Sequence, residues 1–376
     1  MRVRIDKGAL HRPLYRAQGV VDRKASTNVL AAVHVVATDN QRLVFTATDY
    51  DVTLSAEVEG EVTEPGAVLL NGRSFFDVVR ALPDGAEITV TSDGTHRVRV
   101  EAGRAYYHLN GLGPEEFPDV VEEGAGRRLT LDKAQLDGML RRTLFSVSGD
   151  ESRPALNGVL FEIEPHEDGQ VRLRMVSTDG HRLSRVERIA SAADYDGGSY
   201  RTIVHRRGAS ELFRIFESDD PSVRVELLGR NIVFETDNTR LQVRQIEESF
   251  PEYQRVIPDK GDVVVTLSRT ALAAAIRRVS TLGSGKHALL RVELEAGRLS
   301  LEMTHADYGD AHEELEVPEY SGGKVAVGFN PRYLLDVLTV IETEMVQLEL
   351  SDQFSPCLVH SDEEPGSVFV VMPMRL

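Results

Sequence analysis

Three short segments of the chain carry residue types that could support catalysis or metal binding. The first is VSTDGHRL, Val176 to Leu183, which places an acid, a glycine, a histidine and an arginine in a row. Such a group could hold a metal, act as a general base or bind a phosphate. Asp-Gly between two alternating runs is also the strongest short signal for a β-hairpin. The first interpretation describes an enzyme, and the second describes a turn.

The other two segments are weaker candidates for chemistry. THADYGDAH, residues 304–312, could gather His305, Asp307, Asp310 and His312 around a metal, but it lies between alternating runs, where a turn is expected. LGSGKH, residues 282–287, lacks the first glycine of a phosphate-binding loop and has His287 where magnesium needs Ser or Thr. Cys357, in the alternating run SPCLVH, is expected to be a small buried apolar residue. The sequence therefore predicts no catalytic residue, no metal and no cofactor.

Composition indicates an ordinary globular protein. The chain has 376 residues, of which 41% are hydrophobic and 27% charged, and it has one cysteine. This length predicts two or three domains. The chain shows neither an apolar run long enough for a membrane span nor an N-terminal signal segment, so we expect a cytoplasmic protein with no membrane partner. The net charge of −17 taken alone argues against nucleic acid.

A threefold internal repeat organises these elements. Segments beginning at Asp6, Asp132 and Ser268 share apolar residues at helical spacing, and each begins with a residue suited to cap a helix. Arg16, Arg142 and Arg278 occupy one equivalent position, as do Thr48, Thr178 and Thr304. A second amphipathic segment begins in each unit at Arg73, Arg206 and Pro331. Each unit therefore predicts helix, strands, helix and strands, and the fold class is α+β.

Phe-Pro-acid elements mark the ends of the first two units, at Phe117 and Phe250. We place the domains at residues 1–126, 127–258 and 259–376. Within these domains the six helices carry more Lys and Arg than Asp and Glu, so the strands and loops hold the acidic excess. Basic helices on an acidic body could present one positive surface to a polyanion, although Arg on solvated helix faces is the simpler explanation.

The motifs TDGHRL, SFPEYQRVIP and the terminal VVMPMRL resemble the bacterial DNA sliding clamp family, the beta subunit of DNA polymerase III, along the whole chain. The resemblance implies the DNA-clamp fold: three domains, each with two helices packed on antiparallel sheets, and a head-to-tail homodimeric ring. It implies a non-catalytic processivity factor that encircles double-stranded DNA without reading sequence and slides along it. The implied partners are the polymerase III alpha subunit, the clamp loader, and other polymerases and repair proteins that bind through short linear peptides.

The resemblance also implies three sets of site residues. The peptide-binding set is Arg153, Leu156, Thr178, Gly180, His181, Arg182, Leu183, Pro251, Arg255, Val256, Pro356, Val370, Val371, Met372, Pro373, Met374, Arg375 and Leu376. The DNA-binding set is Arg23, Lys24, Arg73, Arg142, Arg207 and Arg278. The dimer-interface set is Phe76, Tyr107, Leu109 and Leu282.

Two alternatives stay open at this point. A specialised or antibiotic-resistance paralog would form the same ring and favour other partners. A hydrolase of a different class would use TDGHRL and HADYGDAH for metal-assisted catalysis, and stoichiometric metal with phosphodiesterase turnover would support it. The clamp interpretation places the protein in the cytoplasm, associated with the nucleoid.

Overall fold

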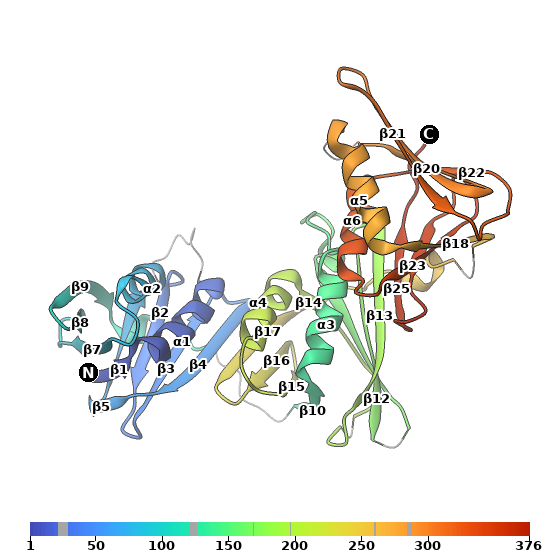
Figure 1. Cartoon of the computed structure of the whole chain (residues 1–376). Helices are drawn as coiled ribbons and strands as arrows, with labels where there is room; N and C mark the ends of the chain where they lie inside the picture. Colours follow the sequence, from blue (N-terminus) through green and yellow to red (C-terminus); the bar gives the residue numbers. More distant parts are fainter. Residues whose placement is uncertain (22–28, 121–125, 168, 196, 259–260, 284–287) are drawn as a thin grey trace. The chain divides into compact units, whose positions relative to one another are not determined.

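A computed structural model describes residues 1–21, 29–120, 126–167, 169–195, 197–258, 261–283 and 288–376. Two compact units divide the chain (Figure 1). Unit 1 comprises Met1–Asp137, Ser191–Gly197 and Arg207–Gln245, and unit 2 comprises Gly138–Ala190, Gly198–Arg206 and Ile246–Leu376. Within the described ranges, none of the helices combines the length and apolar character that a membrane span requires.

The order of elements repeats three times, as the sequence predicts. The first repeat contains β1 (Arg2–Asp6), α1 (Lys7–Val20), β2 (Ala32–Ala37), β3 (Arg42–Thr48), β4 (Val52–Glu59), β5 (Glu61–Glu64), β6 (Gly66–Asn71), α2 (Gly72–Ala81), β7 (Glu87–Ser92), β8 (Arg97–Ala102) and β9 (Ala105–Leu112). The second contains β10 (Arg127–Asp132), α3 (Lys133–Leu144), β11 (Gly158–Pro165), β12 (Gln170–Thr178), β13 (Arg182–Ser191), β14 (Tyr200–His205), α4 (Arg206–Phe216), β15 (Ser222–Leu228), β16 (Asn231–Thr236) and β17 (Thr239–Ile246). The third contains β18 (Val263–Ser268), α5 (Arg269–Val279), β19 (Leu290–Glu295), β20 (Gly297–His305), β21 (Gly309–Val317), β22 (Val325–Phe329), α6 (Pro331–Val340), β23 (Met345–Leu350), β24 (Cys357–His360) and β25 (Ser367–Val371).

The first helix of each repeat begins at the capping residue that the sequence predicts. The Asp6 carboxylate accepts hydrogen bonds from the backbone N–H groups of Gly8 and Ala9, and Asp132 accepts one from Gln135 at 2.7 Å. Ser268 Oγ accepts one from Ala271. Each cap satisfies backbone donors that the helix leaves without a partner.

Unit 1 contains two antiparallel strand arrays. One runs β5-β1-β7-β8-β9, and the other runs β6-β2-β3-β4-β17-β16-β15-β10. α1 packs against α2, β3 and β4. The β4–β17 pair joins the first repeat to the second, and Leu54 lies opposite Leu241 in its register.

Unit 2 joins the second repeat to the third in the same way. β25 pairs with β13, and Ser184 lies opposite Phe369. On its other edge β25 continues through β24 and β23 to β18. A separate four-stranded sheet runs β21-β20-β19-β22. The buried core of the third repeat lies among α5, α6 and these strands, and it includes Leu272, Ile276, Leu301 and Phe369.

Candidate functional site

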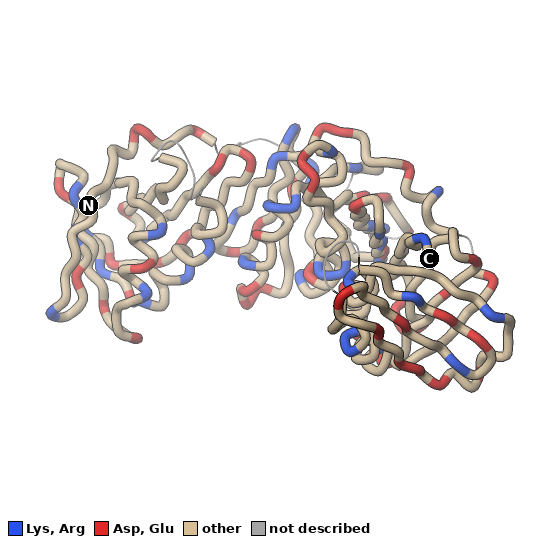
Figure 2. The backbone as a smooth tube through the Cα atoms, turned by 90° about the horizontal axis from the view of Figure 1, so that it is seen from above, with Lys and Arg blue, Asp and Glu red and all other residues tan. Residues whose placement is uncertain are grey.

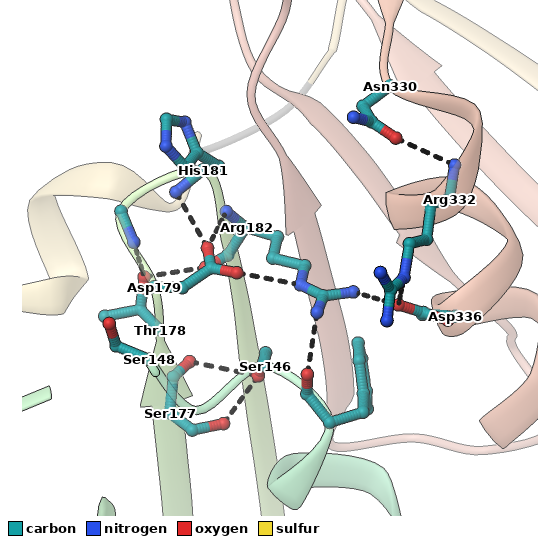
Figure 3. A network of polar contacts seen from close by, with 12 residues as sticks. Ser146, Ser148, Ser177, Thr178, Asp179, His181, Arg182, Asn330, Arg332 and Asp336 are labelled. Atoms are coloured by element: carbon teal, nitrogen blue, oxygen red, sulfur yellow. Dashed lines mark hydrogen bonds and ion pairs between the residues drawn. The ribbon is translucent and has the colours of Figure 1, made fainter. Parts of the chain in front are cut away.

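The segment VSTDGHRL forms the tight turn between β12 and β13 (Figure 3). Gly180 has φ +89°, which lies in the left-handed region that favours glycine. The Asp179 carboxylate accepts from the backbone N–H groups of His181 and Arg182, at 2.9 and 3.0 Å, and Thr178 Oγ1 accepts from that of Gly180 at 3.1 Å. The hairpin prediction is therefore confirmed, and the acid of the segment serves the turn.

Arg182 is a buried connector, with only 9% of its surface exposed. Its guanidinium donates to Asp179 at 3.1 Å, to Asp336 of α6 at 2.5 Å and to the Phe145 carbonyl at 2.8 Å (Figure 3). It also lies over the rings of Phe145 and Tyr333, 5.2 and 4.7 Å from their centroids. Direct contact between Arg182 and a peptide, as predicted, needs an accessible guanidinium. The structure instead makes Arg182 a residue that positions its neighbours.

His181, by contrast, lies on the surface beside the C-terminal tail. Its ring is stacked with that of Tyr333, with centroids 6.0 Å apart. Its carbonyl accepts a hydrogen bond from Met372 N at 2.8 Å, and Met374 N donates to the Gly328 carbonyl at 2.8 Å. The C-terminal tail, Met372 to Leu376, therefore continues β25 past the hairpin and then contacts β22. This path places Met372, Pro373 and Met374 half-buried beside His181, with Arg375 and Leu376 exposed.

A small apolar cluster underlies this surface. It brings together three predicted residues from distant parts of the sequence, Leu156, Leu183 and Val370, with Phe250 and Tyr253 from the segment after β17. Val371 points the other way, into the core of the third repeat. Residues alternate between two faces of a strand, so Val370 and Val371 cannot share this role.

The remaining predicted peptide-binding residues surround the apolar cluster, and their side chains differ in how exposed they are. Arg153 donates to the Asp179 carbonyl at 3.0 Å, which ties the 3-10 turn Pro154–Leu156 to the hairpin. A second 3-10 turn, Tyr253–Val256, leaves the Arg255 side chain 82% exposed and Val256 42% exposed. Pro251 is exposed, and Pro356 is half-buried just before β24. The arrangement offers an apolar base and a polar rim, which suits a short peptide with a hydrophobic anchor.

The structure adds residues that sequence reasoning missed. The Tyr333 ring stacks with His181 and lies under the Arg182 guanidinium. Asn330 caps α6 by accepting from Arg332 N at 2.9 Å (Figure 3). Phe354, 70% exposed, lies in the loop before Pro356. The sequence predicted a helix beginning at Pro331, but it gave no sign that this helix would meet the hairpin.

Tyr253 anchors the segment after β17 through a buried polar network. Its hydroxyl donates to Glu162 Oε2 at 2.8 Å, and Arg174 pairs with Glu162 and Glu187 at 2.9 and 2.8 Å. Burial, reinforced by the bond to Glu162, raises the pKa of Tyr253 to about 12. This network fixes the turn that carries Arg255 and Val256.

The predicted DNA-binding arginines have different surroundings. Arg142 needs correction: it is buried and paired with Glu364 and Glu342, so its guanidinium cannot reach a phosphate. Arg207 pairs with Asp49 and donates to the Val20 carbonyl at 2.8 Å. The Arg73 and Arg278 side chains are 73% and 61% exposed. Each has an acidic neighbour: Arg73 lies 3.7 Å from Asp77, and Arg278 pairs with Glu313. Arg23 and Lys24 lie outside the described residues.

Charges of both signs are interspersed along both units in Figure 2. Several helix arginines pair with acids or donate to backbone carbonyl groups, as Arg142, Arg207 and Arg278 do. The basic excess on the helices, which the sequence suggested as one positive surface, is thus partly neutralised within each unit.

The dimer candidates lie on one strand, on one α-helix and at the end of one short helix. Tyr107 is 36% exposed and Leu109 half-buried on β9, while Phe76 of α2 packs on His11 with ring centroids 5.1 Å apart. Leu282 is half-buried at the end of the short helix after α5. The role of these four residues at an interface stays a prediction.

The metal and thiol candidates behave as structural residues. Residues 304–312 comprise the end of β20, a three-residue turn and the start of β21, and His312 lies beside Glu302 and Glu314 at 3.3 and 3.1 Å. In the described ranges, no three His, Cys, Asp or Glu side chains are grouped to hold a metal. Cys357 is buried in β24, and burial raises the pKa of its thiol. Most of LGSGKH lies outside the described residues.

Comparison with known proteins gives a consistent result over the whole chain. The three domain models of the DNA polymerase III beta subunit match in order: N-terminal at residues 1–121, central at 130–252 and C-terminal at 254–375. Curated proteins called beta sliding clamp, from Caulobacter vibrioides and Pseudomonas putida, are 33% and 35% identical, with all of each chain covered.

Solved structures of sliding clamps are also similar to the chain over its whole length. A sliding clamp from Pseudomonas aeruginosa bound to griselimycin has a TM-score of 0.92 at 35% identity, with complete coverage of both chains. The Caulobacter crescentus polymerase III beta structure has a TM-score of 0.90 at 32% identity, also with complete coverage.

Proposed function

The chain belongs to the DNA polymerase III beta subunit family, and on that premise we propose that it is a processivity factor that encircles duplex DNA and tethers a polymerase to it. The observation that carries this proposal is the tandem match of all three domain models to a chain whose elements repeat three times. A clamp has no catalytic step, which accords with the structural roles found for Asp179, Arg182 and Cys357. We place it in the cytoplasm, associated with the nucleoid, and divide it into domains at residues 126 and 258.

The polymerase and other partners would bind at the hairpin and tail of unit 2. The apolar cluster of Leu156, Leu183 and Val370 would receive a hydrophobic anchor of a partner peptide. Arg153, His181, Arg255 and the tail residues Met372 to Leu376 would form its rim. Arg182 would act indirectly, because it holds the hairpin against α6.

DNA would be held by charge and not by sequence. Arg73, with its side chain 73% exposed, and Arg207 remain candidates for phosphate contact, together with Arg23 and Lys24. Contacts of this kind weaken as salt rises because they release counterions. A closed ring stays on circular DNA because the two are topologically linked, and salt does not change this linkage.

Retention on nicked circular DNA tests the function. The protein is loaded by a clamp loader, excess protein is removed in high salt, and the circle is then cut once. We expect retention on the circle and loss after cutting, while a linear duplex blocked at both ends retains the protein. Equal retention before and after cutting would show ordinary DNA binding and refute the ring.

Griselimycin, the ligand in the Pseudomonas aeruginosa structure, serves as a probe for the peptide site. We expect calorimetry to give tight binding to the wild-type chain and about tenfold weaker binding to His181→Ala. Arg224→Ala, an exposed residue of β15 in unit 1, is the matched control. Unchanged affinity for His181→Ala would place the site elsewhere.

A further inference from the structure

Arg16 of α1 is a buried cation that makes no ion pair with the described residues. Only 8% of its surface is exposed. One guanidinium nitrogen, Nη1, donates to Asn238 Oδ1 at 3.2 Å and to Thr239 Oγ1 at 2.5 Å, and both acceptors are uncharged. Within the described ranges, Nε and Nη2 have no acceptor. A buried charge is costly unless an opposite charge accompanies it.

The second repeat shows the same position with its charge compensated. Arg142 is the equivalent of Arg16, and it donates to Glu364, with Nε to Oε2 at 3.3 Å, and pairs with Glu342 at 3.2 Å. Burial lowers the pKa of Arg16. Burial acts on Arg142 in the same direction, but its two carboxylate partners outweigh it and raise the pKa. The two arginines therefore differ in whether the chain supplies a carboxylate.

The absent carboxylate corresponds to one turn of the fold. β17 pairs with β4 of the preceding repeat, as β25 pairs with β13, and these two strands begin at Thr239 and Ser367. Glu364 lies in the turn before Ser367, and Asn238 lies in the turn before Thr239. The turn that brings a glutamate to the arginine of the second repeat thus brings an asparagine to the arginine of the first.

A cavity of about 890 Å³ lies beside Arg16. Its walls come from α1, from β3 and β4, from the residues after α4, and from the turn between β16 and β17, all within unit 1. Pro13, Ala56 and Val58 line it with apolar surface. Its volume lies within the range of protein sites that bind ligands.

The rim of this cavity is acidic. It is formed by Glu217, Asp219, Asp220 and Asp237, which are exposed or half-buried and make no ion pair within the part of the chain that the structure describes. Hydrogen bonding to Asp220, together with the charge of Asp220, raises the pKa of the Asp237 carboxyl. The cavity therefore combines a buried cation that lacks an anion with a rim of anions that lack a cation.

We propose that this cavity binds the free carboxyl terminus of a basic peptide, with the terminal carboxylate on Nε and Nη2 of Arg16 and a Lys or Arg side chain of the peptide among the rim carboxylates. The carboxylate takes the place that Glu364 has beside Arg142. A guanidinium presents its donors in a planar fork that matches a carboxylate. Arg12, exposed on the same helix, adds positive charge near Arg16.

The charge pattern selects this ligand among other anions. Duplex DNA or an acidic peptide would bring several negative charges against the four rim carboxylates, and like charges repel. A ligand with one carboxylate and a neighbouring cation complements both parts of the cavity. A chain end passes the rim with one length of backbone, whereas an internal Asp or Glu brings two. The site does not depend on the ring, because all of its residues lie in unit 1.

Calorimetry with short peptides tests the ligand. The full-length chain is titrated with acetyl-glycyl-lysyl-leucine that carries a free carboxyl terminus, and we expect saturable binding. The same peptide with an amidated terminus, or with glutamate in place of lysine, should bind about tenfold more weakly, because each change removes one charge-assisted contact. Equal affinity for the acid and the amide overturns the proposal.

Asn238→Asp tests the position, because it supplies within the chain the carboxylate that the ligand would bring. It should raise the melting temperature of the transition that includes unit 1 by about 2–4 °C and weaken peptide binding about tenfold. Loss of binding in a stabilised variant is not a folding defect. Gln170→Glu, exposed on β12 in unit 2, adds the same charge and should change neither quantity. Wild-type peptide affinity in Asn238→Asp refutes the site.

Arg16→Gln tests the cation directly. It removes the charge and keeps a donor for Thr239, so peptide binding should fall about tenfold while the chain stays folded by circular dichroism. A short DNA duplex is the competitor, and it should leave the peptide bound. If the duplex displaces the peptide and Arg16→Gln weakens duplex binding, Arg16 is a DNA contact and the peptide site is refuted.

Discussion

Replacing Arg182 should destabilise unit 2 strongly, because its guanidinium joins two carboxylates and a carbonyl, of which, among the described residues, only Asp336 has a second cation, Arg332 at 3.8 Å. The Asp179 and Asp336 side chains are 17% and 33% exposed and lie 3.1 and 2.5 Å from it. Removing one partner of a buried ion pair costs about 3–5 kcal/mol, since the other charge stays buried without compensation. Partial exposure of Asp336 favours the lower part of this range, so we expect about 3 kcal/mol for Arg182→Ala.

Differential scanning calorimetry provides the assay. A loss of about 3 kcal/mol should lower the melting temperature of the transition that includes unit 2 by roughly 6–12 °C. Arg182→Lys keeps the charge but loses the planar fork and should give an intermediate loss. The matched control is Arg153→Ala, whose side chain is 47% exposed and pairs with Asp150 on the same turn. Its melting temperature should change by about 1–2 °C.

One double variant and one further measurement make the reasoning refutable. Arg182→Met with Asp336→Leu removes Arg182 together with one of its two carboxylate partners. It should recover part of the loss, because a buried pair exchanged for apolar groups is often neutral, while Asp179 still lacks its cation. If Arg182→Ala melts like the wild-type chain while griselimycin binding falls, the connector role is wrong and direct ligand contact is right.

Further predictions follow from single contacts. Tyr253→Phe should cost about 1–2 kcal/mol, because Glu162 loses a buried donor. Since folding raises the pKa of Tyr253 to about 12 from its usual 10, its contribution is complete below pH 10 and lost as pH rises towards 12, so urea denaturation should show a decline there that Tyr253→Phe reduces. Cys357 should resist a thiol reagent in the folded protein and react in urea, because it is buried with a raised pKa; rapid labelling of the folded chain would contradict this. Gly180→Ala should lower stability by about 1 kcal/mol because φ is +89°, whereas Gly94→Ala, in an open turn, serves as the control in the same melt.

Much of the local structure was predictable from sequence. The capped starts at Asp6, Asp132 and Ser268, the second helices and the Asp-Gly turn were all predicted and confirmed. These features depend on neighbours within a few residues, where side-chain capping, turn preference and periodicity decide the conformation.

The hydrogen-bond or ion-pair partner of each polar side chain could not be predicted from such local preferences. Arg16, Arg142 and Arg278 share one position in the repeat, and the sequence treated Arg142 and Arg278 alike as DNA contacts. Arg16 and Arg142 instead find acceptors 222 residues away, while Arg278 pairs with Glu313 beside it. The acceptor depends on which hairpin the tertiary pairing of strands brings to the helix.

The sequence by itself determined the repeat, the elements within it and the family. Only the tertiary structure decided that Arg182 is buried while His181 is exposed, although the two are adjacent in a turn. The physical reason is that a hairpin directs consecutive side chains to opposite faces, and α6 covers one of those faces from more than 150 residues away. Local preference fixes the turn, and long-range packing assigns the role of each residue in it.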